Sequence, residues 1–120
     1  MPTQQPLTIH QAVDLITQPY REKIRKLERR ESGRVEFFEA VSVVAEYGSS
    51  FQMITRDISA TGIRLLSTRQ ILCQVIGVTI QSYHFSVRII WSYPVTDDMF
   101  EYGGKFLDVT CQDDASINRG

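Results

Sequence analysis

The chain has 120 residues and a mass of 13.8 kDa, which is enough for one domain with a modest core. Hydrophobic residues make up 42% and charged residues 22%, as in soluble globular proteins, and the net charge of −1 argues against general nucleic-acid binding. The two cysteines and two histidines form no CxxC or HExxH spacing, so neither a metal site nor a metal-dependent enzyme is expected. No apolar run approaches the roughly 18 residues of a membrane span. Residues 1–11 lack the features of a signal peptide, and we therefore expect a cytoplasmic protein.

The charges are distributed unevenly along the chain. Between Arg21 and Arg34 there are seven basic residues and three acids, so this segment holds more than half of the 13 lysines and arginines. Between Thr96 and Gly120 six acids outnumber two bases. A solvated helix face would explain the basic cluster, and a focused anion-binding site is the alternative.

Residues 1–27 are predicted to form an N-terminal arm that is helical from about residue 8. Thr8 and Gln11 have the spacing of a capping box at a helix start. Apolar residues follow at steps of three or four, which is helical periodicity. They are Ile9, Val13, Ile16, Tyr20, Ile24 and Leu27. Pro19 interrupts this apolar stripe, so we expect two helices or one kinked helix with a break near Thr17–Gln18. The stripe must pack on the body of the domain or, in a homodimer, on a second copy of the chain.

After Gly33 the apolar period changes to two, which predicts strands. The predicted strands cover residues 35–47, 51–57, 63–67, 75–80, 83–91 and 102–109. In 83–91 the odd-numbered residues, from Tyr83 to Trp91, are expected inside the fold and the even-numbered ones outside. Pro94 to Met99 is predicted to be a loop. Short strands with regular turns indicate a mainly β fold, a small sandwich or barrel over residues 28–110, followed by a flexible tail over 111–120.

Two segments stand out as candidates for binding. The first contains Arg29, Arg30 and Arg34. Arg30 and Arg34 are four residues apart across the bend expected at Ser32-Gly33, so their guanidinium groups can converge on one anion. The second, residues 57–62, is a turn with a carboxylate, a hydroxyl and a glycine. A carboxylate acceptor beside arginine donors is also what the two edges of a guanine require. No nucleophile–base pair or glycine-rich phosphate loop is present, so we expect no catalytic residue and no enzyme.

The two segments together resemble the signature of a known family. Arg30-x-x-x-Arg34 followed by Asp57-x-Ser59-x-x-Gly62 is similar to the two-part motif of PilZ domains, bacterial receptors for cyclic di-GMP. Glu28-Arg29 resembles the residues that precede this motif in the family, and segments 87–91 and 103–108 resemble its later strands. The resemblance covers residues 28–110, although the spacer Glu31-Ser32-Gly33 departs from the bulkier or basic residues common there.

This resemblance implies a fold and a ligand. The fold would be a six-stranded antiparallel, Greek-key-like PilZ barrel with the arginine loop over its outer surface. Arg30 and Arg34 would bind phosphate and guanine edges, Asp57 and Ser59 would read guanine, and Gly62 would allow a close approach. Arg29 would accompany a stacked pair of cyclic di-GMP molecules rather than one.

Family members do not turn the nucleotide over, and they signal by changing shape or by binding a protein partner. The ligand would therefore be cyclic di-GMP, with no cofactor and an effector protein that the sequence does not identify. We expect the loop from Glu28 to Arg34 to become ordered on binding. One alternative is a PilZ-like protein-interaction module without nucleotide binding. Another is a small barrel for single-stranded nucleic acid, which the inward pattern of the aromatic residues and the single basic cluster disfavour.

Overall fold

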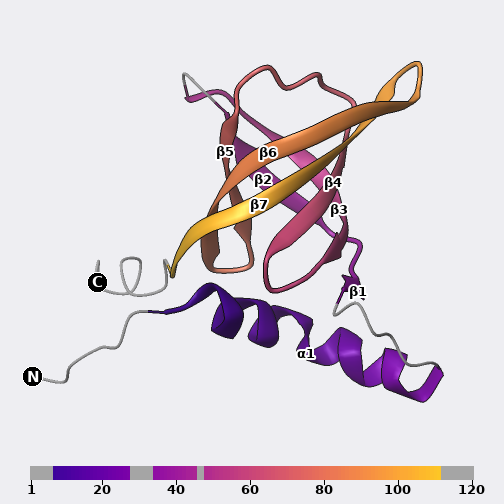
Figure 1. Ribbon diagram of the computed structural model, residues 1–120, viewed down its shortest axis with the longest axis vertical. Helices are drawn as coiled ribbons and strands as arrows, with labels where there is room; N and C mark the ends of the chain where they lie inside the picture. Colours follow the sequence, from indigo (N-terminus) through magenta and orange to yellow (C-terminus); the bar gives the residue numbers. More distant parts are fainter. Residues whose placement is uncertain (1–6, 28–33, 46–47, 112–120) are drawn as a thin grey trace, which may run out of the picture.

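The computed structural model describes residues 7–27, 34–45 and 48–111, with the backbone alone over 21–27. These described residues form one N-terminal helix and seven strands (Figure 1). The elements are α1 (Ile9–Leu27), β1 (Val35–Glu36), β2 (Ala40–Val44), β3 (Ser50–Ile58), β4 (Gly62–Ser67), β5 (Val75–Ile80), β6 (Tyr83–Thr96) and β7 (Met99–Cys111).

Six of the strands form a closed antiparallel barrel. The order around the barrel is β3-β2-β5-β6-β7-β4, and pairing between β3 and β4 closes it, while the short β1 adds to β3. The segment from β4 to β5 joins strands that are not neighbours, so it crosses one end of the barrel, as a Greek-key-like fold requires. The expectation of a mainly β fold, a six-stranded antiparallel Greek-key-like barrel with an N-terminal helix, is confirmed.

The prediction of one long strand over 35–47 is wrong, because the structure has two strands there, β1 and β2. The hydroxyl of Thr55, on the neighbouring β3, occupies the break. It accepts a hydrogen bond from the Glu39 N–H at 2.8 Å and donates one to the Phe37 carbonyl. Phe37 still points into the core, so the apolar alternation continues across the break although the strand pairing does not.

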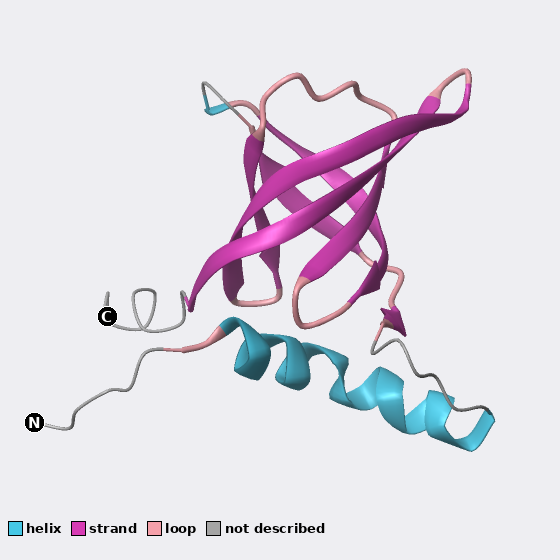
Figure 2. Ribbon diagram, in the orientation of Figure 1, coloured by secondary structure: helices cyan, strands magenta, loops and turns pink. Residues whose placement is uncertain are grey.

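The prediction of a loop from Pro94 to Met99 is also wrong. β6 and β7 continue as a two-stranded ribbon to a tight turn at Asp97-Asp98, at the upper right of Figure 2. β5 pairs with β6 only as far as Arg88, so the outer part of β6 is paired with β7 alone. A proline is tolerated in a strand with such a free edge, because no second partner needs its missing N–H.

α1 lies across one end of the barrel, below the turns that join β3 to β4 and β5 to β6 (Figure 2). Its capping box is present, because the Thr8 N–H donates to Gln11 Oε1 at 3.0 Å and the Gln11 N–H to Thr8 Oγ1 at 3.1 Å. Val13 and Ile16 are buried against the barrel. Of the two alternatives, two helices or one kinked helix, the structure has one helix with Pro19 inside it.

The helix continues past Pro19, and directly after the proline Tyr20 contacts the barrel. Beyond the proline, the Tyr20 ring meets the Phe37 ring edge-on, with centroids 4.9 Å apart. The Tyr20 hydroxyl donates a hydrogen bond to Glu39 Oε2 at 2.6 Å. The described part of the apolar stripe therefore packs within the chain, and a homodimer through this stripe stays a prediction.

Candidate ligand-binding site

The turn between β3 and β4 is shaped by Ser59. Its Oγ accepts hydrogen bonds from the N–H groups of Thr61 and Gly62, both at 3.2 Å, while its own N–H donates to the Gly62 carbonyl at 2.9 Å. Gly62 does not have a positive φ. Glycine is needed there because a Cβ would clash with the Gly104 carbonyl of the adjacent β7. The close approach expected at Gly62 is therefore made by the protein's own backbone.

Asp57, at the end of β3, holds two arginines at the barrel surface. Its carboxylate is 6% exposed and accepts hydrogen bonds from Arg34 Nε at 3.0 Å and from Arg64 Nε at 2.9 and 3.0 Å. Arg34 Nη2 also lies 2.9 Å from Asp57 Oδ1, and Arg64 Nη2 bonds Oδ2. Arg34 Nη1 reaches Ser59 Oγ at 3.4 Å. The arrangement brings residues from β3, β4, the turn and the segment before β1 to one point.

The two guanidinium groups keep Asp57 ionised. Burial by itself would raise the pKa of this carboxyl, but the hydrogen bonds and positive charges of Arg64 and Arg34 outweigh it and hold the pKa below its usual range. The same interaction raises the pKa of Arg64. The cluster is thus an ion-paired unit at neutral pH.

A second buried carboxylate continues this cluster along the barrel wall. Glu101 on β7 is 2% exposed, and its Oε1 lies 2.9 Å from Arg56 Nη1 and 3.4 Å from the Tyr93 hydroxyl. Its Oε2 is 3.9 Å from Arg64 Nη1. Arg64 therefore lies between two carboxylates, with Asp57 as its main partner.

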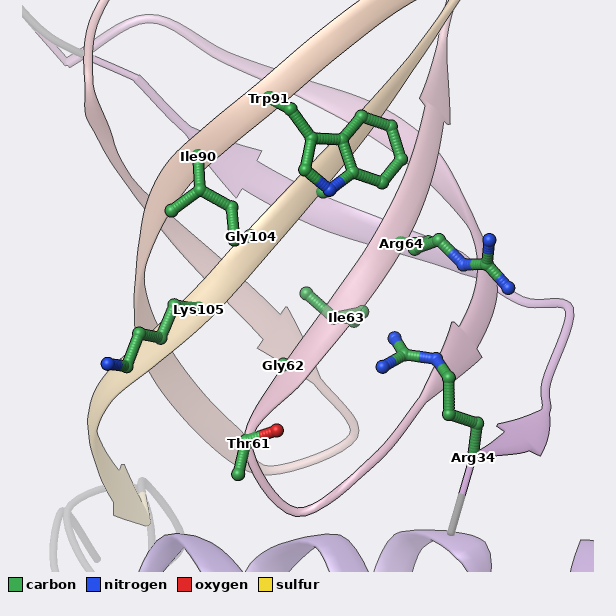
Figure 3. Close-up of a pocket in the computed structure, with 10 residues that line it drawn as sticks. Arg34, Thr61, Gly62, Ile63, Arg64, Ile90, Trp91, Gly104 and Lys105 are labelled. Atoms are coloured by element: carbon green, nitrogen blue, oxygen red, sulfur yellow. The ribbon is translucent and has the colours of Figure 1, made fainter. Parts of the chain in front are cut away.

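Beside the arginines the outer wall has an open pocket of about 600 Å³ (Figure 3). Its lining comes from the turn between β3 and β4, from β4, β6 and β7, and from the residue before β1. The lining residues are Arg34, Thr61, Gly62, Ile63, Arg64, Ile90, Trp91, Gly103, Gly104 and Lys105. Trp91 covers Gly103, where a Cβ would clash with the indole, and its ring stacks on Tyr93 with centroids 5.8 Å apart. The pocket therefore offers guanidinium groups, an aromatic ring and a backbone floor without side chains.

The expectation that Trp91 lies inside the barrel is wrong. The pairing of β6 with β7 shifts register between Ile89 and Trp91, and this bulge moves the following side chains to the other face. Trp91 is 38% exposed and Ile90 57%. The alternation predicted for 83–91 holds for the buried Phe85 and Val87, before the bulge.

The structure brings together four of the six predicted site residues: Arg34, Asp57, Ser59 and Gly62. Arg29 and Arg30, like the rest of the predicted mobile loop before Arg34, lie outside the described residues, as does the tail beyond Cys111.

Sequence reasoning missed three residues of the site: Arg64, Trp91 and Lys105. Arg64 alternates with the buried Ile63 and Leu65, so its place on the outer face could have been read from the strand pattern. The other two depend on how β7 lies beside β4 and β6.

The fold and this cluster define a small β-barrel domain with an arginine-rich pocket on its wall. A family model of the PilZ domain matches residues 28–120. The chain therefore belongs to the PilZ domain family, whose members are binding or adaptor modules and include receptors for cyclic di-GMP. The resemblance seen in the sequence is confirmed.

Among solved structures, the chain is similar to the Bacillus subtilis inhibitor of motility, MotI/DgrA. The identity is 13% and the TM-score 0.52, over 77% of this chain and 51% of that one, so this likeness concerns the fold. The chain thus spans about half the length of that protein. No curated protein sequence matches the chain. Within the described ranges, no helix is long and apolar enough to cross a membrane.

Proposed function

We propose that this protein is a cytoplasmic, non-enzymatic receptor for cyclic di-GMP that signals by ordering of the arginine loop or by binding an effector protein. The observation that supports it is the meeting of Arg34, Asp57 and Ser59, from both halves of the PilZ signature, at one end of an open pocket. Among the described residues, no group of three His, Cys, Asp or Glu side chains could hold a metal ion. The side chains that line the pocket can bind a ligand by hydrogen bonds, charge and stacking.

The chemistry of the pocket suits a guanine nucleotide. An arginine fork can bind phosphate oxygens or the O6/N7 edge of guanine through two parallel hydrogen bonds. The exposed indole of Trp91 provides a surface on which a base can stack. Arg29 and Arg30 immediately precede the loop residues that lead to Arg34, so they are placed in the chain to add cationic contacts for a single ligand or a stacked pair.

Guanine reading by Asp57 requires a rearrangement of its partners. A carboxylate offers about four acceptor positions, and Arg34 and Arg64 already occupy both oxygens of Asp57. A guanine N1–H and N2–H₂ edge can reach Asp57 only when one arginine turns away. A phosphate of the ligand provides the alternative anion for that arginine, so binding would exchange one set of ion pairs for another.

Arg34→Ala should weaken binding of cyclic di-GMP by about 2–5 kcal/mol, because it removes one member of a charge-paired contact. The affinity can be measured by calorimetry and by the fluorescence of Trp91, which is the single tryptophan of the chain and lines the pocket. Arg30→Ala should have an effect of the same size. Arg64 still pairs with Asp57 in the Arg34 variant, so circular dichroism should show a folded barrel.

Arg69→Ala is the matched control, because Arg69 lies outside the pocket, with its guanidinium 5.0 Å from the centre of the Phe51 ring. This variant should bind like the wild type. Equal affinities of wild type, Arg30→Ala and Arg34→Ala would contradict the proposed site. A wild type that binds no dinucleotide would instead favour the interaction module.

Asp57→Ala should lose selectivity for guanine. The wild type should bind cyclic di-AMP far more weakly than cyclic di-GMP, since a site that hydrogen-bonds a specific group can reject the analogue by about 10⁴-fold. In the variant the guanine N–H groups would have no acceptor, so the two affinities should approach each other. Comparable wild-type affinities for both dinucleotides would show that Asp57 positions the arginines without reading the base.

A further inference from the structure

The cations that surround the pocket are not equally neutralised. Arg34 and Arg64 share the carboxylate of Asp57, and Arg56 lies 2.9 Å from the carboxylate of Glu101. Lys105 also lines the pocket, but its ammonium has no hydrogen bond or ion pair with any residue that the structure describes. Of the three cations that line the pocket, Arg34 and Arg64 are paired with an acid, whereas Lys105 is not paired with any described residue.

Lys105 lies across the pocket from the two arginines (Figure 3). In the antiparallel pairing of β4 with β7, Lys105 is the Cα partner of Gly62. Arg64, two residues after Gly62, is the partner of Gly103, two residues before Lys105. Strand geometry therefore separates the backbones of Lys105 and Arg64 by about 8 Å. The surface between them includes Gly62 and Gly104, which carry no side chain that would block a ligand.

We propose that Lys105 binds a second anionic group of the ligand, at the opposite edge of the pocket from Arg34 and Arg64. The inference rests on the proposed function, and for cyclic di-GMP the group would be the second of its two phosphates. The side chain of Lys105 is exposed, and its flexible four-carbon stem lets the ammonium move over the glycine floor. An ammonium group binds phosphate as a point charge, without the fixed two-bond geometry of a guanidinium group. It can therefore bind the second phosphate whatever its orientation relative to the arginines.

The decisive variant is Lys105→Met, which keeps an apolar stem and removes the charge. Its Kd for cyclic di-GMP should rise about tenfold or more, since a hydrogen bond to a charged group is lost. The binding should also become less sensitive to salt, because one charge–charge attraction is removed. Lys105→Arg should keep most of the affinity. The melting temperature without ligand should not change, because the exposed lysine has no ion pair in the described structure.

Arg88→Met provides the matched control. Arg88 is the Cα partner of Lys105 on β6 and is exposed, but it does not line the pocket. The loss of its charge should change Kd by no more than about twofold, which measures the general electrostatic effect on this wall.

The possible outcomes separate the two proposals. If Lys105→Met binds like the wild type, or loses only as much affinity as Arg88→Met, the role of Lys105 is overturned while the receptor function stands. If the wild type shows no affinity for cyclic di-GMP, both are overturned. A selective loss in Lys105→Met, with Arg88→Met and Lys105→Arg close to the wild type, supports the contact.

Discussion

Asp57 determines the electrostatics of the candidate site. A carboxylate that is 6% exposed would be costly alone, and it is stable here because two guanidinium groups bond its oxygens. One partner, Arg34 before β1, is 23 residues away in the chain, and the other, Arg64 in β4, is seven residues away across the turn between β3 and β4. One buried charge therefore ties together the two halves of the PilZ signature.

The depressed pKa of Asp57 predicts a pH dependence of stability. A group whose pKa is lower in the folded than in the unfolded chain stabilises the fold above the unfolded value, about 3.9 for aspartate, and loses this contribution as pH falls through the folded value. Wild type should therefore be more stable than Asp57→Asn at pH 7, and the gap should shrink below about pH 4. Urea unfolding of both proteins at pH 7 and pH 3 measures this gap.

Asp97→Asn is the control for that experiment, because Asp97 lies exposed in the turn between β6 and β7. The free energy of unfolding of this variant should follow that of the wild type at both pH values. A gap between wild type and Asp57→Asn that is the same at pH 3 and pH 7 would show that the ion pairs do not contribute through the charge of Asp57.

At the scale of elements, α1 completes the core by covering one end of the barrel. Ala12, Val13 and Ile16 are at most 5% exposed, and they enter the same cluster as the barrel interior. The helix also donates the Tyr20 hydrogen bond to Glu39, beside the break between β1 and β2. A helix built into the core in this way is part of the domain, although the PilZ match begins at residue 28.

Ile16→Ala should lower the free energy of unfolding by about 2–5 kcal/mol, because it leaves a cavity under the helix. Chemical denaturation followed by circular dichroism measures the change. Leu15→Ala is the matched control, since Leu15 is the next residue on the same helix and is 53% exposed. Its effect should stay within about 0.5 kcal/mol. Equal effects of the two variants would contradict the packing of α1 on the barrel.

At the scale of the whole molecule, the pocket lies on the outside of a closed barrel, so a ligand can bind without opening the core. The barrel interior is filled by apolar side chains such as Phe85 and Val43, and the pocket is built on the outer faces of β4, β6 and β7. The number of ligands bound on this wall should therefore depend on how many cations are available to offset the charge of their phosphates.

We predict two cyclic di-GMP molecules per chain, bound as a stacked pair. Two ligands bring four phosphates together, and a guanidinium from Arg29 would offset their repulsion and stack on an outer guanine. Calorimetry at protein concentrations well above Kd should give a ratio of two for the wild type and a ratio nearer one for Arg29→Leu.

Arg25→Leu removes the same charge from the basic stretch of α1 and serves as the control. This variant should keep the wild-type ratio of two. A ratio of one in the wild type would leave Arg29 with a general electrostatic effect alone.

Local patterns in the sequence determined much of this protein. The helix over Ile9–Leu27 follows from apolar residues at steps of three and four, and most strands follow from alternation, because each pattern places one face against a core. The meeting of Arg34, Asp57, Ser59 and Gly62 was predicted by the resemblance of their two motifs to the PilZ signature. All of these features depend on neighbours in the chain or on a motif of fixed spacing.

Only the tertiary structure decided which side chains complete the pocket. Trp91 reaches the outer wall because a bulge against β7 reverses the faces of β6, and a shift of one residue in register cannot be seen in an alternating sequence. Arg64 contacts Asp57 because β3 pairs with β4, and Lys105 lies opposite Gly62 because β4 pairs with β7. The contact of Arg64 with Asp57 needs the β3–β4 pairing, and that of Lys105 with Gly62 needs β7 to close the barrel, so neither is visible in the local pattern of the sequence.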